Sequence, residues 1–159
     1  MLVRVWALLF LMLPVFCFGA ADSVKIESDK LNYSGKSKVS IFEGNVIAYY
    51  QDVVIYADKM TVTFTGEKDV ENILCEGNVK VVKGEMYSLS EFAEFKVKEN
   101  VAVLKKNVRV WQGENYLEGD EVTLYDDDER IVVNRSDNSR VKIIFRPEGE
   151  KIDAKSRKP

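Results

Sequence analysis

Histidine is absent from the 159-residue sequence, which contains only two cysteines and three prolines. Without histidine the chain cannot form Ser-His-Asp or Cys-His catalytic sites, histidine-ligated metal sites or an ordinary histidine pH switch. Two thiols cannot supply a four-cysteine metal site. The prolines stand at Pro14, Pro147 and Pro159. The long proline-free stretch between Asp22 and Arg146 therefore suggests continuous backbone hydrogen bonding.

The charge balance also excludes a class of function. The net charge is -3 and the isoelectric point is about 5.2. A general role in nucleic-acid binding is not expected, because such proteins carry an excess of Lys and Arg. The acidic run Asp126–Glu129 lacks the glycine and the oxygen-rich spacing of a calcium loop. It is interpreted as a hairpin tip, and we predict neither a metal site nor a cofactor.

Residues 1–21 are predicted to be a secretory signal peptide that is cleaved on export. Arg4 is followed by an apolar run from Val5 to Phe18, which is shorter than the roughly 18 residues that span a bilayer. Small residues then favour cleavage after Ala21, with cleavage after Gly19 as the alternative. An uncleaved N-terminal anchor is a further alternative.

Export would also change the cysteine content. A lipoprotein anchor at Cys17 is disfavoured, because Phe16 stands where such sites carry a small residue. Cleavage removes Cys17 and leaves Cys75 as the only thiol, which cannot form an internal disulfide. Cys75 is interpreted as a small buried hydrophobic residue.

From Val24 onward, apolar and polar residues alternate with period two, as in Met60–Phe64 and Val108–Trp111. This pattern is typical of strands with one buried face. Short turn signals such as Gly77-Asn78 recur between the runs, and typical strand lengths give about fifteen strands. The segment Ser88–Lys98 is ambiguous, because its apolar residues also suit a short amphipathic helix.

An internal repeat favours a strand there. Asn-Val dipeptides begin at Asn45, Asn78 and Asn107, and thirteen residues after each Asn stands an acid preceded by a small residue. The acids are Asp58, Glu91 and Asp120, and Asp29 heads a partial copy. Periods of 33 and 29 residues indicate stacked β units. The acids are interpreted as turn and solvation residues rather than as metal ligands or catalytic carboxylates.

The repeat predicts the fold class. The same apolar parity recurs in each copy, so the inner faces should form one continuous apolar trough. We expect an all-β, elongated jelly roll or sandwich over residues 22–146. A propeller fits poorly, because its blades need about 40–45 residues. Alternation stops at Pro147, and residues 147–159 are predicted to form a mobile tail, with a role in touching an anionic surface left open.

Five short motifs occur in order between about residues 24 and 146. They are Ile26-Glu27-Ser28-Asp29, Glu43-Gly44-Asn45-Val46-Ile47, Tyr56-Ala57-Asp58-Lys59-Met60, Leu117-Glu118-Gly119-Asp120-Glu121-Val122 and Arg140-Val141. With the signal peptide, they resemble the OstA-like family of periplasmic lipopolysaccharide-transport proteins, of the LptA bridge type. The resemblance implies a twisted β-jelly roll of about 15–16 antiparallel strands with open ends and an apolar interior.

The resemblance also implies a function and partners. The interior would carry the acyl chains of lipopolysaccharide, in its lipid A part, across the periplasm without an enzymatic reaction. The partners would be an inner-membrane LptC-type jelly roll, an outer-membrane LptD-type jelly roll and further copies of the chain, head to tail. First-strand residues that line the lipid path correspond to Val24 and Ile26. Phe64 stands where the family has an arginine, so a charged headgroup contact is not carried over there.

Inward parity and the resemblance together give a set of predicted lipid-binding residues. They are Val24, Ile26, Leu31, Tyr33, Val46, Ala48, Met60, Val62, Phe64, Val79, Val81, Ala93, Phe95, Val97, Val108, Val110, Val122, Leu124, Val141 and Ile143.

Two alternatives stay open. The first is a membrane-tethered module of the same pathway, similar to LptC or to the N-terminal part of LptD, which would keep its N-terminal segment. The second is a structural or carbohydrate-binding β-sandwich, in which Tyr49, Tyr50, Trp111 and Tyr116 stack on sugars. Ordinary cross-strand aromatic pairing also explains those residues. An enzyme is the least expected class, because no nucleophile and base can be paired from the sequence.

Overall fold

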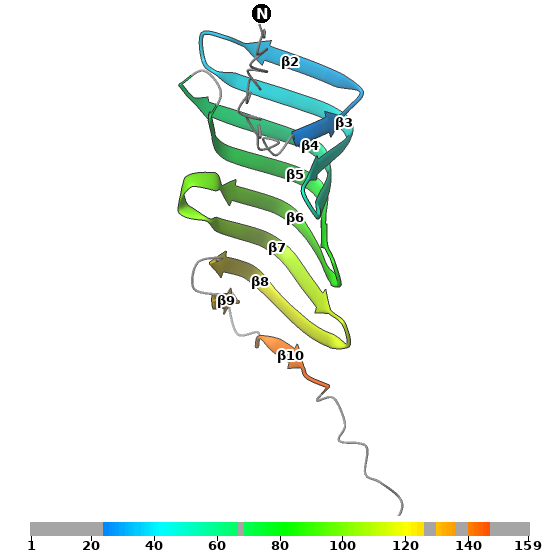
Figure 1. The fold of residues 1–159 in the computed structure, drawn as a ribbon. Coiled ribbons are helices and arrows are strands. Elements are labelled where there is room, and N and C mark those ends of the chain that lie inside the picture. Colours follow the sequence, from blue (N-terminus) through cyan, green and yellow to red (C-terminus); the bar gives the residue numbers. More distant parts are fainter. Residues whose placement is uncertain (1–23, 67–68, 126–129, 136–139, 147–159) are drawn as a thin grey trace, which may run out of the picture.

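The computed structural model describes residues 24–66, 69–125, 130–135 and 140–146. The predicted signal peptide 1–21, acidic tip 126–129 and tail 147–159 lie outside these ranges. Within them, ten strands form one antiparallel sheet in the order β1-β3-β4-β5-β6-β7-β8-β10, with β2 paired to β3 and β9 to β8 (Figure 1). The elements are β1 (Val24–Glu27), β2 (Lys30–Ser34), β3 (Val39–Tyr50), β4 (Val53–Thr65), β5 (Asp69–Lys83), β6 (Met86–Lys96), the 3-10 turn η1 (Val97–Glu99), β7 (Val101–Gln112), β8 (Asn115–Tyr125), β9 (Arg130–Asn134) and β10 (Lys142–Ile144).

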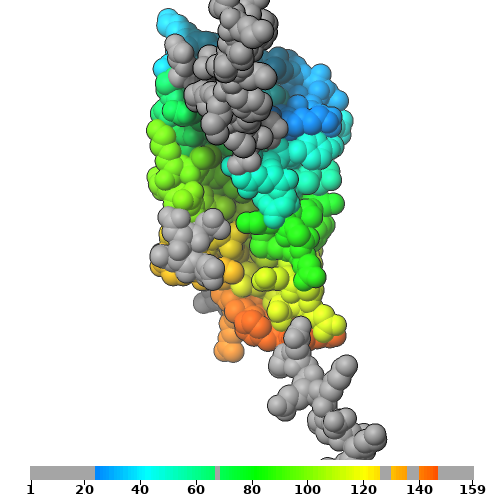
Figure 2. Space-filling model, viewed as in Figure 1, coloured from blue at the N-terminus to red at the C-terminus, as the bar shows by residue number. Residues whose placement is uncertain are grey.

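The strands stack like rungs from β2 to β10, and the body is elongated along this direction (Figures 1 and 2). The strands at the two ends of the sheet do not pair with each other, so the sheet is not closed into a barrel. The prediction of an all-β, antiparallel fold with open ends is confirmed. Within the described ranges, no helix has the length and apolar character that a membrane crossing requires.

The strands are fewer and longer than the sequence pattern suggested. Strands β3 to β8 have 11 to 15 residues, and the pairing register shifts near the middle of each. Each half resembles a separate short strand in the sequence, which explains the expected count. The ambiguous segment Ser88–Lys98 is extended as far as Lys96, and η1 follows.

The register shift in β3 is a bulge built from two consecutive residues with left-handed backbone. Gly44 has φ 80° and Asn45 has φ 45°. The Asn45 side chain donates a hydrogen bond from Nδ2 to Asp29 Oδ2 at 2.8 Å, and the Asp29 backbone N–H donates to the Gly44 carbonyl at 2.9 Å. A Cβ added to Gly44 would lie 2.9 Å from the Asp29 Cβ, so this close approach requires glycine.

The same arrangement, which we call the corner, recurs along the sheet. Beside Gly77, Asn78 Nδ2 donates to Asp58 Oδ2 at 2.8 Å. In β7, Asn107 donates to Glu91. The acids and asparagines that repeat in the sequence are therefore partners on adjacent strands, and the side-chain amide of the asparagine donates each of these hydrogen bonds.

The residue before each acid is small because it is buried inside the corner. Ala57 and Ser90 are 6% and 8% exposed, and Gly119 is also buried. A Cβ added to Gly119 would lie 2.5 Å from Val133 Cγ1 and 3.3 Å from the Asn134 carbonyl oxygen. The two halves of the sheet approach closely along this line, and larger side chains would force them apart.

The third corner departs from the glycine rule. Lys106 stands in the glycine position with φ 66°, a conformation that costs an L-residue roughly 1–2 kcal/mol. Its acid is Glu91 rather than an aspartate. The extra methylene of glutamate lets the carboxylate reach Asn107 from further away, which leaves room for the Lys106 Cβ.

These geometries predict opposite effects of two substitutions. Lys106→Gly should raise the free energy of unfolding by about 1 kcal/mol, because it removes the left-handed strain. Gly77→Ala should lower it by more than about 2 kcal/mol, because it adds that strain and brings a Cβ to 2.9 Å from the Asp58 Cβ. Urea unfolding followed by circular dichroism measures both.

Gly84→Ala is the matched control. Gly84 also has positive φ, at 55°, but no atom lies within 4 Å of its added Cβ. This variant should lose only the strain component, about 1 kcal/mol. Equal losses for Gly77→Ala and Gly84→Ala would contradict the steric role of the corner.

Candidate functional site

One face of the sheet, called the inner face here, carries the buried side chains. The fully buried hydrophobic residues are Val46, Ala48, Ile55, Ala57, Met60, Val62, Cys75, Val79, Val81, Ala93, Leu104, Val108 and Val122. Partly buried residues pack against them: Ile26, Phe42, Val53, Phe64, Val70, Ile73, Phe95, Val110, Leu117, Leu124 and Val133. The cluster draws on both halves of the long strands, because the corner turns both halves toward the same side.

Most of the predicted lipid-binding residues lie in this cluster. Val46, Ala48, Met60, Val62, Val79, Val81, Ala93, Val108 and Val122 are buried, and Ile26, Phe64, Phe95, Val110 and Leu124 pack against them. Val24, Leu31 and Tyr33 are exposed at one end of the sheet, and Val141 and Ile143 at the other. Val97 is 43% exposed in η1, outside the strands, so the strand parity assumed for it does not apply.

The sequence reasoning missed several inner-face residues. Ile55, Ala57, Cys75 and Leu104 are as deeply buried as the residues it found. The predicted inward positions were those that follow each acid and each Asn, whereas Ile55 and Ala57 precede Asp58. Counting backward in steps of two from the small residue before the acid would have identified both.

The inner face is continuous across the whole sheet. On one side of the corners a cross-strand row consists of Leu31, Phe42, Met60, Cys75, Ala93, Leu104, Val122 and Val133. On the other side the row is Ile26, Ala48, Ile55, Val81, Ser88, Val110, Leu117 and Ile143. Leu31 is 57% exposed and Ile143 is 48% exposed, so the apolar surface reaches both ends.

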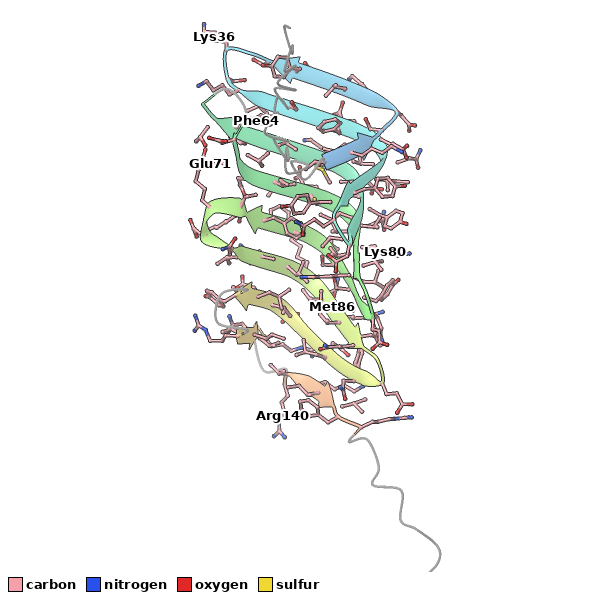
Figure 3. The ribbon with its side chains drawn as sticks, viewed as in Figure 1. Lys36, Phe64, Glu71, Lys80, Met86 and Arg140 are labelled. Atoms are coloured by element: carbon pink, nitrogen blue, oxygen red, sulfur yellow. The ribbon has the colours of Figure 1, made fainter. Side chains whose placement is uncertain are left out.

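Burial decreases from the corners toward the free ends of the strand halves. Met60 and Val108 near the corners are fully buried, whereas Phe64, Phe95 and Leu124 further out are only partly buried. Figure 3 shows Phe64 close to one end of its strand, far from Lys80. Partly exposed apolar side chains therefore lie along the margins of the inner face.

The inner face offers no reactive group at neutral pH. Burial raises the pKa of the Cys75 thiol to about 12, and the Glu76 carboxylate adds to the shift. Since the thiolate is the nucleophilic form, this cysteine is inert. The other buried polar side chains are Ser40, Ser88 and Ser90. Among the described residues, no group of three or more His, Cys, Asp or Glu side chains could hold a metal ion.

The hollows on the surface are polar and lie outside the inner face. The larger, about 610 Å³, surrounds the third corner and is lined by charged and amide side chains including Lys105, Asn107 and Arg135. The second, about 340 Å³, is lined by residues such as Thr63, Glu94 and Lys96. Among the described residues, the apolar inner face is therefore the surface that suits an apolar ligand.

An open antiparallel sheet with a continuous apolar face and no nucleophile–base pair on it defines a class of binding or carrier protein. The sequence matches the family model described as "LptA/(LptD N-terminal domain) LPS transport protein" over residues 25–130. Because the match covers more than half of the chain, the chain belongs to this family of lipopolysaccharide-transport proteins. The resemblance noted in the sequence is confirmed, as is the expectation of a transport protein rather than an enzyme.

Comparison with solved structures shows the same fold. The chain is similar to "LptH, the LptA homologous periplasmic component of the conserved lipopolysaccharide transport device from Pseudomonas aeruginosa", with a TM-score of 0.70 and 16% sequence identity. The match covers 79% of this chain and 96% of the LptH chain. No curated protein matches the chain significantly.

The burial of Cys75 predicts its reactivity. Exported protein should fail to react with a thiol reagent at about pH 8, because almost none of the thiol is ionised and its sulfur is covered. Full reaction is expected once denaturing urea unfolds the sheet. Rapid stoichiometric labelling of the folded protein, absent in Cys75→Ala, would contradict the packing of the inner face.

Proposed function

We propose that this protein binds the acyl chains of lipopolysaccharide on its inner face and carries the lipid across the periplasm. The observation that carries the proposal is the unbroken apolar inner face, which runs in register from β1 and β2 to β9 and β10. Membership of a lipopolysaccharide-transport family supports this lipid as the ligand.

The energetics favour a carrier. Burying each CH₂ of an acyl chain contributes about 0.8 kcal/mol, so partial burial of about ten carbons would hold a chain firmly. The inner face is apolar along its length, and neighbouring rows offer nearly the same surroundings. An acyl chain could therefore slide from strand to strand without leaving apolar surroundings.

The predicted signal peptide supports a periplasmic location, and the unpaired edge strands support the partners. A cleaved signal peptide would place the chain in the periplasm. The outer edges of β2 and β9 have no partner strand within the described sheet, and unpaired edges accept further strands. One end would dock on an LptC-type jelly roll, the other on an LptD-type jelly roll, and copies of the chain would join head to tail between them. Retention of Met1 in exported protein would instead indicate the tethered LptC-like module.

Photo-crosslinking tests the trough. A photoreactive residue at Val62 or Phe95, on the inner face, should capture lipopolysaccharide in intact cells, as detected by immunoblotting. The same residue at Thr63 or Lys96 should not, because each is one position further along its strand and therefore on the opposite face. Equal capture at both parities would rule out the trough.

Light scattering tests the assembly. The mass should rise with protein concentration, because head-to-tail contacts do not close. Ile131→Lys should weaken association at least about tenfold, since a charge at an exposed edge strand blocks strand addition. Thr123→Lys, on the outer face of the neighbouring strand, is the matched control and should leave association unchanged. Monomers at every concentration, with lipid present or absent, would contradict head-to-tail assembly.

A further inference from the structure

The outer face carries a row of aromatic rings on one side of the corners. In register from β6 to β8, Tyr87, Trp111 and Tyr116 stand side by side, with ring centroids 5.3 and 5.2 Å apart. Tyr49 lies in the same row on β3, and Tyr56 lies in the adjacent row on β4. All five rings are only partly buried. We call these five residues the aromatic platform.

Cations are interleaved with the rings. Lys80 Nζ lies 4.8 Å from the Tyr56 ring centroid and 5.4 Å from that of Tyr87. Lys25 stands over Tyr49 at 5.2 Å and Lys142 over Tyr116 at 5.7 Å. In Figure 3, Lys80 projects outward from the side of the sheet. Lys25 is also ion-paired with Glu27 at 2.6 Å. The ring faces hold Lys80 and Lys142 in place without neutralising their positive charge.

Two acids on this surface already have partners. Glu27 pairs with Lys25 at 2.6 Å. Glu118 accepts a hydrogen bond from the Tyr116 hydroxyl at 2.8 Å and an ion pair from Arg135 at 2.7 Å. These two contacts lower the pKa of the Glu118 carboxyl. Arg109, in the same cross-strand row as Glu118, is exposed. The platform therefore presents a surplus of positive charge.

The other half of the outer face is built differently on the same fold. Its lysines pair with carboxylates across the strands, as Lys30 does with Glu43 and Lys59 with Glu76. That half also holds one ring–cation contact, between Arg130 and Tyr125 at 3.9 Å. The three rings in mutual contact, with a lysine between two rings, belong to the platform half. This concentration of rings and lysines supports a ligand-binding role for the platform.

The position of the platform indicates which ligand. Tyr49, Tyr87, Trp111 and Tyr116 each stand one residue from the end of their strand. That end is the rim of the trough, where the headgroup of a lipid held on the inner face would emerge. A headgroup that bends over this rim reaches the platform directly.

We propose that the aromatic platform binds the phosphorylated sugars of the same amphiphile whose acyl chains occupy the inner face. Sugar C–H groups would pack on the negative faces of the rings, while Lys80, Lys142 and Arg109 would bind phosphate. This proposal rests on the proposed function, because it assigns the second part of the ligand to a second surface.

Trp111 provides the measurement. The sequence contains two tryptophans, Trp6 and Trp111, and cleavage of the predicted signal peptide removes Trp6. Exported protein, checked by mass, is titrated with deacylated, phosphorylated core oligosaccharide while tryptophan fluorescence is recorded. We expect a saturable change, and about tenfold weaker binding of the dephosphorylated sugar.

Matched variants locate the interaction. Lys80→Gln should weaken binding of the phosphorylated sugar about fivefold, because it removes a cation between two rings. Tyr87→Ala should weaken it by a similar factor or more. Lys59→Gln, on the other half of the outer face, should change nothing. Circular dichroism confirms folding, and Lys80→Gln keeps the test valid if Tyr87→Ala unfolds.

Three results would overturn the proposal: no Trp111 response to the sugar, the same response from inorganic phosphate alone, or equal weakening by Lys59→Gln. Photo-crosslinking from position Phe95 to lipid A that lacks core sugars is the second measurement. It distinguishes failure of the platform proposal from failure of the proposed function. A loss of the platform leaves the Phe95 crosslink intact, whereas a wrong trough abolishes it.

Discussion

The hydrogen bond from a corner asparagine to an acid on the preceding strand is the constraint on which the rest of the structure depends. It fixes two consecutive residues in the left-handed conformation, as at Gly44 and Asn45. The resulting bulge opposes two residues of one strand with one of the next. In β4 the inward positions consequently change from odd to even across Asp58, from Ile55 and Ala57 to Met60 and Val62. Both halves of β4 therefore face the same side. In the bulged strand β3 the inner positions stay even across the corner, from Phe42 to Val46, because β3 has one residue more there than β4.

Period two and the repeat were enough to predict an all-β fold, an elongated stack and most of the inner face, whereas the open ends were implied by the family resemblance. The pairing inside the corner was not predictable in the same way. In the sequence, Asn45 aligns with the acid that follows it, Asp58, whereas in the structure it bonds Asp29, the acid that precedes it. Only the strand pairing brings together residues that are 16 or 20 positions apart. The missed residues Ile55 and Ala57 have a different cause, because they precede Asp58 and the repeat was followed only forward from each acid and each Asn.

The two faces of the sheet divide the molecule by chemistry. The inner face consists of apolar rows, and burial raises the pKa of its Cys75 thiol, so this group stays neutral. The outer face has two different halves. In one half Lys30 and Lys59 pair with carboxylates across the strands, and in the other Lys80 lies between the rings of Tyr56 and Tyr87. An amphiphile has two parts with opposite solvation needs. A bent sheet would offer an apolar surface to one part and a polar surface to the other, and the two surfaces meet at its rim.

The corners also bear on how copies would join. Along the sheet, strands that carry an acid alternate with strands that carry an asparagine. The series begins with Asp29 beside β2 and ends with Asp120 in β8 and Asn134 in β9. A following copy stacked head to tail would present its own Asp29 to the end that finishes with Asn134. In that arrangement Asp29 would keep its own partner Asn45, and Asn134 would keep Glu121. The junction would then continue the alternation of acids and asparagines without a new bond between them, beside the short strands β1 with β2 and β9 with β10. A flat edge could add a strand in any register, whereas an edge interrupted at the corner permits only the register that continues the trough.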